Sequence, residues 1–302
     1  MSREKIFSQA FVAFKVLVVG LCLYLAYVSG KWGLADYYYS QCQQAMKTWD
    51  KDPPTVDAWR DAYTPLQQAL NLDSTNPVYN DWMGRLYHAR WNLDPTHAKQ
   101  WGELSKQAFR QSLAVRPKWP LTWANLALMK VDLGEYDGKL DRAVLNATQY
   151  GPWEPGVHQI VALIGAQGLF HFNPKIQSAI VANDARGLIS PVPGSAQVVA
   201  DTLANTWALD RPIIWPRIGA ALLARHWQDD HFKRYRMFSR VTFEFWQYFP
   251  ASLQQQLLAK VVGVADDPQV VRLAAKDQRL GDLCPRLSPG KLFDQYCARS
   301  RN

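Results

Sequence analysis

An apolar segment near the N-terminus constrains this chain more than any other feature. Residues 10–30 read AFVAFKVLVVGLCLYLAYVSG, in which Lys15 is the only charged residue. About 20 apolar residues in a helix cross the hydrocarbon core of a bilayer. Lys15 lies near the N-terminal end, where its long side chain can reach the lipid headgroups. The sequence therefore predicts a transmembrane anchor over 10–30, preceded by a short cytoplasmic tail over 1–9.

The charges on either side of this segment predict its orientation. Arg3 and Lys5 precede the segment, and Lys31 is the one nearby basic residue after it. Because basic residues favour the cytoplasmic side, we expect a single-pass protein of the inner (cytoplasmic) membrane with its C-terminal domain in the periplasm. The alternative is a cleaved signal peptide with its cleavage site at residues 28–30. The anchor is favoured because the apolar stretch is longer than the core of a typical signal peptide, and both alternatives export the remaining chain.

Two of the four cysteines lie close together near the C-terminus. Cys284 and Cys297 are 13 residues apart in the segment CPRLSPGKLFDQYC, whose prolines and glycine favour a bent loop. In an oxidising compartment, a disulfide there would stabilise the fold by about 3 kcal/mol according to loop-closure estimates. The sequence predicts this disulfide, with two unpaired thiols as the alternative.

The rest of the chain has the pattern of an all-α protein. With 48% hydrophobic and 20% charged residues, the composition excludes a disordered chain. Apolar residues recur at i, i+3, i+4 and i+7 between breaks rich in Pro, Gly and Asp, whereas sustained alternation typical of strands is missing. The predicted helices cover approximately 34–48, 55–71, 77–90, 99–115, 120–134, 137–149, 156–170, 174–188, 195–208, 213–226, 229–248, 251–264 and 267–279.

A set of residues recurs along this helical region, which indicates an internal repeat. The recurring positions are Pro77, Met83 and Gly84, then Pro120, Leu126 and Ala127, then Pro155, Val161 and Ala162. The first offset is 43 residues and the second is 35. A loop extension of about nine residues over 91–100 would explain the longer first period.

Small residues at one repeat position predict how the helices of each hairpin pack. Gly84, Ala127 and Ala162 occupy the place where the two helices come closest, because a larger side chain would push the helices apart. Phe109 is placed to fill the groove beside Gly84. Trp123 lies at an interior packing position, so we expect it in the core.

These residues resemble the tetratricopeptide (TPR) family over approximately 55–165. Two signature positions differ, because Asn80 stands where Trp is usual and Lys130 stands where Tyr is usual. The segment from Leu133 to Tyr136 resembles the turn between the two helices of a repeat, with Gly134 as a left-handed cap. The resemblance implies a TPR-like α-solenoid of stacked hairpins over 31–155, and we expect a C-terminal helical region over 156–302 to continue it. A generic array of helical hairpins is the alternative.

The whole-chain layout resembles the VpsP-type bacterial exopolysaccharide biosynthesis proteins. The shared features are an N-terminal anchor, degenerate helical repeats and a helical tail rich in Trp. The resemblance implies a role in making or exporting an extracellular polysaccharide, and it supplies no catalytic residue.

Motifs for catalysis and cofactor binding are missing from the sequence. It has no G-x-x-x-x-G-K-[ST] or G-x-G-x-x-G for nucleotides, no H-E-x-x-H or C-x-x-C for metals, and no G-x-S-x-G for hydrolysis. His226 and Asp230 are spaced to share a helix face, but a solvated helix start is favoured over a metal site. We predict no catalytic, cofactor-binding or metal-ligating residue, no cofactor and no nucleic-acid partner.

Two features are candidates for binding. Segment 231–249 interleaves aromatic residues with the basic residues Lys233, Arg234, Arg236 and Arg240. On an exported protein, such a basic face could bind an acidic polysaccharide, an anionic lipid or an acidic protein. The alternative is a solvated helix over an aromatic core. Trp91 and Trp101 flank the predicted loop extension and are candidates for exposed contacts that stack on sugar rings.

Together, these features favour a membrane-anchored scaffold over an enzyme. The expected partners are the membrane and a protein of a polysaccharide polymerase, ligase or export complex, with an acidic polysaccharide as a further candidate. The first alternative is an all-helical lyase or glycosidase, which needs convergent carboxylates; Asp57, Asp61 and Asp81 are the acids near the Trp-rich region. The second alternative is an assembly factor for another membrane complex.

Overall fold

The computed structural model describes residues 3–49, 53–188, 190, 192, 195–204 and 217–218. Helices account for all the regular structure of these residues, which contain no strand, so the all-α prediction is confirmed for this part of the chain. The elements are α1 (Arg3–Met46), α2 (Val56–Leu72), α3 (Pro77–Leu93), η1 (Pro95–His97), α4 (Ala98–Val115), α5 (Pro120–Asp132), α6 (Gly138–Tyr150), α7 (Pro155–Gly168), η2 (Leu169–His171), α8 (Pro174–Leu188) and α9 (Ser195–Ala204).

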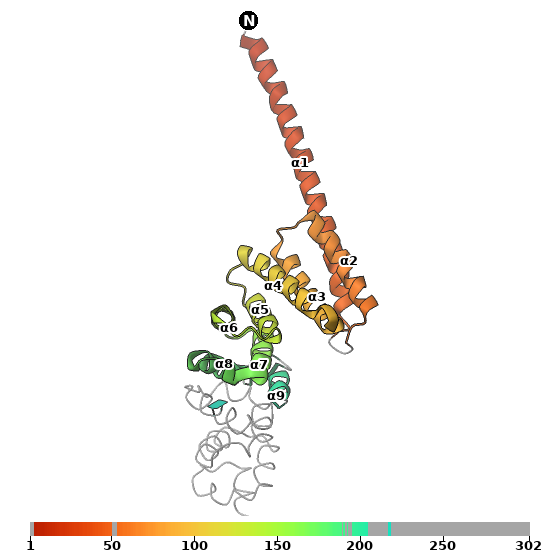
Figure 1. The fold of residues 1–302 in the computed structure, drawn as a ribbon. Helices are drawn as coiled ribbons and strands as arrows, with labels where there is room; N and C mark the ends of the chain where they lie inside the picture. The colour runs from red at the N-terminus through yellow and green to blue at the C-terminus, as the bar shows by residue number, and fades with distance from the viewer. Residues whose placement is uncertain are drawn as a thin grey trace, which may run out of the picture. The chain divides into compact units, whose positions relative to one another are not determined.

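Helix α1 joins two segments that the sequence predicted as separate. The anchor was expected over 10–30 and the next helix over 34–48, but a single helix of 44 residues runs from Arg3 to Met46 (Figure 1). No proline interrupts it, and Gly30 and Gly33 weaken a helix without breaking it. The helix is long and apolar enough to cross a membrane, and none of its apolar window is buried.

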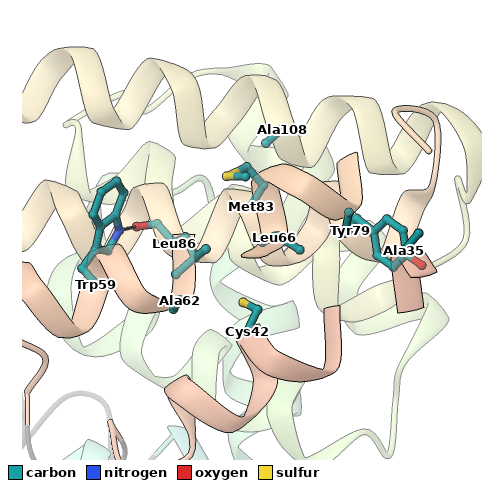
Figure 2. Close-up of a cluster of buried hydrophobic side chains, with 10 residues drawn as sticks. Ala35, Cys42, Trp59, Ala62, Leu66, Tyr79, Met83, Leu86 and Ala108 are labelled. Atoms are coloured by element: carbon teal, nitrogen blue, oxygen red, sulfur yellow. Dashed lines mark hydrogen bonds between the residues drawn. The ribbon is translucent and has the colours of Figure 1, made fainter. Parts of the chain in front are cut away.

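The chain divides into two compact units, Met1–Pro117 and Lys118–Asn302. In the first unit, α2 packs on α1, α3 packs on α2, and α4 packs on α3. The core of this unit draws residues from all four helices, as Figure 2 shows for Cys42 of α1 beside residues of α2 and α3. Its buried members are Ala35, Cys42, Trp59, Ala62, Leu66, Ala69, Tyr79, Met83, Leu86 and Ala108.

In the second unit, each described helix packs on its neighbour in sequence and on the next but one. Helix α5 contacts α6 and α7, and α7 contacts α8 and α9. Helix α6 also contacts α8. The first helices of successive hairpins, α5, α7 and α9, therefore lie side by side. So do α6 and α8, the second helices of the first two hairpins.

Proline begins the first helix of each repeat. Pro77, Pro120 and Pro155 stand at the start of α3, α5 and α7, which are the positions that the repeat offsets relate. Proline is favoured there because its fixed φ suits a helix and its missing N–H would have no partner inside the helix. At α3, the side chain of Asn76 accepts a hydrogen bond from the N–H of Val78 at 3.0 Å.

The extra residues of the first repeat mostly lengthen its helices, contrary to the loop predicted over 91–100. Helix α3 continues to Leu93, a single turn spans Pro95–His97, and α4 begins at Ala98. The apolar contacts of Trp101 and Leu93 explain the difference, because they extend the core to the end of the hairpin.

The turn between α5 and α6 has the left-handed glycine that the sequence predicted. Gly134 has a φ of 70°, and the N–H of Glu135 donates to the carbonyl of Lys130 at 2.8 Å. Lys130 is 2% exposed, and its ammonium group donates to Glu135 at 2.6 Å and to Asp137 at 3.1 Å. Lys130 therefore pairs with two acids of the following turn.

Candidate functional site

Gly84 allows the two helices of the first hairpin to come close together. A Cβ atom on residue 84 would lie 2.5 Å from Cε1 of Phe109, and Phe109 is completely buried. Ser105 supports the same contact, since its hydroxyl donates to the carbonyl of Gly84 at 2.8 Å. The residues that the repeat pattern singled out in α3 and α4 are thus in direct contact.

The corresponding positions of the next two hairpins are also buried. Ala127 and Ala162 are both 0% exposed. Between α7 and α8, however, the tightest approach of a glycine is at Gly165, where a Cβ would lie 2.7 Å from Cγ2 of Ile180. This position is three residues after Ala162, on the same helix face. Trp123, which we expected in the core, is half-buried.

An aromatic cluster surrounds an arginine where α2, α3 and α4 meet. The rings of Trp59 and Tyr63 stack with centroids 4.7 Å apart, and those of Tyr87 and Trp101 stack at 6.0 Å. The guanidinium carbon of Arg90 lies 5.2 Å from the Trp59 ring centroid and 5.6 Å from that of Trp101. We call these five residues the Arg90 cluster. It is a cation–π arrangement in which the cation belongs to the protein itself.

Hydrogen bonds fix the rings of the Arg90 cluster. The indole N–H of Trp59 donates to the carbonyl of Leu86 at 2.7 Å, and that of Trp101 donates to Asp94 at 3.1 Å. The hydrogen bond from Trp101 is the largest cause of the lowered pKa of Asp94. Contacts with His97 lower this pKa further, while desolvation acts in the opposite direction. Two nitrogens of Arg90, Nε and Nη1, are buried without a hydrogen-bond partner among the described residues.

The tryptophans predicted to make exposed contacts are half-buried. Trp101 belongs to the Arg90 cluster, and Trp91 has its ring 5.9 Å from that of His88. Among the five tryptophans of the repeat region between Trp82 and Trp123, the exposed one is Trp119, at 46%. The helical extension of the first hairpin explains the difference, because it covers side chains that a loop would have left in solvent.

A second polar cluster lies within the second unit. His158 Nδ1 donates to Asn183 Oδ1 at 2.9 Å, and Asn183 Nδ2 lies 3.4 Å from Asp184 Oδ1. All three residues are at most 1% exposed. Burial raises the pKa of Asp184 to about 8, although Asn183 and Arg186 act in the opposite direction. These residues were not predicted as a site, because helical periodicity alone does not distinguish a buried Asn-Asp pair from a solvated one.

The three acids considered for an enzyme, Asp57, Asp61 and Asp81, differ in burial and in their charged partners. Asp57 is exposed and pairs with Arg60 at 2.9 Å, whereas Asp81 is buried and pairs with Arg85 at 2.8 Å. Asp61 is exposed on α2. Within the described ranges, no group of three or more His, Cys, Asp or Glu side chains is arranged to hold a metal ion.

Two predicted features lie outside the described residues. These are the basic face with Lys233, Arg234, Arg236 and Arg240, and the disulfide between Cys284 and Cys297. The predicted helices over 229–248, 251–264 and 267–279 also lie outside them. These features stay predictions.

Comparisons with known proteins identify no family for this chain. Neither a protein-family model, nor a curated protein, nor a solved structure matches it. The resemblances to TPR repeats and to the VpsP-type proteins therefore stay predictions.

Proposed function

We propose that this chain is a single-span inner-membrane protein whose periplasmic helical hairpins form a TPR-like scaffold for exopolysaccharide biosynthesis or export. The observation that carries the proposal is the continuity of α1. Its apolar stretch from 14 to 27 is exposed, whereas Ala35 and Cys42 in its C-terminal part are completely buried in the first unit. One rigid element thus belongs both to the proposed span and to the folded core.

The packing of the hairpins supports a repeat array. Proline begins α3, α5 and α7, and small residues are buried at equivalent positions of all three helices. Arrays of this kind offer extended surfaces to partner proteins and need no catalytic residue. Anchoring such an array in the membrane raises its effective concentration beside membrane-bound partners.

The role in polysaccharide biosynthesis rests on the VpsP-type layout, and a genetic experiment tests it. The gene is deleted in the bacterium that carries it, and cell-surface polysaccharide is measured. We expect a loss of polysaccharide that the full chain restores. Replacing residues 1–33 with a cleavable signal peptide should restore little, because the released domain is diluted through the periplasm. Unchanged polysaccharide in the deletion strain would contradict the proposed role.

A fusion experiment tests the orientation separately. Alkaline phosphatase is active only after export, so we expect an active enzyme when it is fused after Asn302. Green fluorescent protein at the same position should be dark when it is exported by the same route. Fluorescent cells with inactive phosphatase would show that the domain stays in the cytoplasm.

A further inference from the structure

The first unit of the fold begins where the apolar segment of α1 ends. Side chains spaced three or four residues apart along one face of α1 are half-buried or buried, while the other side chains from 29 to 37 stay exposed. This covered face comprises Val28, Lys31, Ala35, Tyr38 and Cys42. Exposure therefore begins to fall at Val28, inside the segment predicted to span the membrane, and α1 continues without a break from that segment into the unit.

The rise per residue of α1 gives the distance between the predicted end of the span and the first buried residue of the unit. At about 1.5 Å per residue, Ala35 lies about 7 to 8 Å beyond Gly30 along the helix axis. The headgroup layer on each side of the hydrocarbon core is about 5 to 7 Å thick. If the hydrocarbon core ends near Gly30, the first completely buried residue of the unit lies at the outer edge of the headgroup layer. The end of the unit nearest the apolar segment must then enter that layer.

The chain direction identifies the residues at this end. Helix α2 runs back along α1, and α3 begins next to Asp36, which accepts a hydrogen bond from the hydroxyl of Tyr79. The turn between α2 and α3 therefore lies at the end from which α1 projects (Figure 1). Ser112 near the end of α4 donates to the carbonyl of Pro77 at 2.7 Å, so α4 ends there too.

The exposed residues at this end suit a lipid interface. Trp32 and Tyr37 are each 57% exposed, and Val115 at the end of α4 is 56% exposed. Trp and Tyr are enriched where hydrocarbon meets water. The turn contributes the small polar residues Ser74 and Thr75, both exposed. We call Trp32, Tyr37, the turn 73–76 and Val115 the membrane-proximal end.

We propose that the membrane-proximal end is a lipid-contact surface, seated in the headgroup layer of the membrane that α1 crosses. The inference rests on the proposed span and adds a second contact between this protein and the bilayer. The rigid helix and the seated end together fix the height of the first unit and the direction in which its hairpin points. A partner in the same membrane would then meet the hairpin at a fixed distance from the surface.

A matched pair of labelling sites tests the proposal. Thr75 lies in the turn at the membrane-proximal end, and Thr96 lies in the turn between α3 and α4 at the other end; both are exposed. Helix α3 separates them by about 25 Å along its axis. Thr75→Cys and Thr96→Cys are made separately in the full chain, coupled to an environment-sensitive fluorophore and reconstituted into phosphatidylethanolamine–phosphatidylglycerol vesicles. The unsubstituted chain, labelled in parallel, measures the background from the native cysteines.

Lipids with a nitroxide on the headgroup then report contact. We expect them to quench the label at residue 75 about twofold more than the label at residue 96, because quenching needs close approach. Equal quenching at the two sites in vesicle-bound protein would overturn the proposal. Flotation with the vesicles is measured first, and failure of the full chain to float would refute the span itself. The two failures are therefore distinguishable.

A linker variant shows whether the rigid helix maintains the contact. A flexible Gly-Ser segment is inserted between Gly33 and Leu34, which leaves the core residues of α1 with the first unit. We expect quenching at residue 75 to fall toward that at residue 96 while flotation persists. A circular dichroism melt of this variant checks that the unit stays folded. Unchanged quenching in the folded variant would mean that lipid contact does not depend on the rigid helix, contrary to the proposal.

Discussion

The ring of Phe109 occupies the space into which a side chain at Gly84 would project. Because an ideal Cβ at residue 84 would lie 2.5 Å from the ring, this pair sets the distance between α3 and α4. Both residues come from the same repeat unit and are 25 positions apart in the sequence. The contact therefore predicts whether a small side chain at residue 84 raises or lowers the free energy of unfolding.

Gly84→Ala should destabilise the first unit. In an uncrowded helix this change stabilises by about 1 kcal/mol, whereas overpacking of a core costs about 1 to 3 kcal/mol. We expect the second effect to exceed the first, and chemical denaturation of the purified protein measures the difference. Gly138→Ala in α6 is the control, because nothing lies within 4 Å of a Cβ there. A stabilised Gly84→Ala variant would show that the helices are not held in contact by this pair.

Asp137, just before α6, both caps this helix and forms an ion pair with Lys130, and two substitutions distinguish the two roles. Asp137 Oδ1 accepts hydrogen bonds from the N–H groups of Lys139 and Leu140, at 3.0 and 2.8 Å, and Oδ2 pairs with the buried Lys130. Asp137→Ala removes both interactions, whereas Asp137→Ser keeps a capping oxygen. Loss of a cap costs about 1 kcal/mol, so we expect the Ala variant to be less stable than the Ser variant by about that amount. Equal stabilities in urea denaturation would contradict the capping role.

Asp184 predicts a dependence of stability on pH. Burial raises the pKa of its carboxyl to about 8, above that of the unfolded chain. Between these two values the folded protein holds a proton that the unfolded chain releases, so this group makes folding less favourable as the pH rises toward 8. Each unit of pKa shift corresponds to about 1.4 kcal/mol, which makes the total effect on the order of several kcal/mol.

Asp184→Asn should remove this dependence. We expect the variant and the parent to have similar melting temperatures near the pKa of a free aspartate, and the variant to melt higher at alkaline pH. Thermal melts over a series of buffers measure both. A parent protein whose stability does not fall relative to the variant with rising pH would show that Asp184 is solvated or paired as a carboxylate.

Alkylation of the cysteines tests the predicted disulfide. Of the four cysteines, Cys42 is buried in the core of the first unit and Cys22 lies exposed on α1. In denaturant without reductant, iodoacetamide should modify Cys22 and Cys42 but spare Cys284 and Cys297. Adding a reductant should expose the second pair, and peptide mass spectrometry identifies each site. Full modification of all four without reductant would mean that the C-terminal cysteines are unpaired.

Local sequence features determined much of the described secondary structure. The 3.6-residue periodicity, the prolines at 77, 120 and 155, and the glycine at 134 each act within one helix or turn, so their effects can be predicted from neighbouring residues. The apolar segment likewise indicates a membrane-spanning helix by its length alone. Gly84 and Phe109 could be paired in advance because both occupy fixed places in a repeated unit.

Contacts between distant segments decided the rest. The sequence predicts a break at residues 31–33, yet α1 continues through it as one helix, and Ala35 and Cys42 beyond it are buried in the core of the first unit. Trp101 was expected in solvent, but Arg90 and Tyr87 from α3 cover it. In both cases the free energy comes from burying apolar surface against residues that are remote in sequence, and that gain exists only once the helices have assembled.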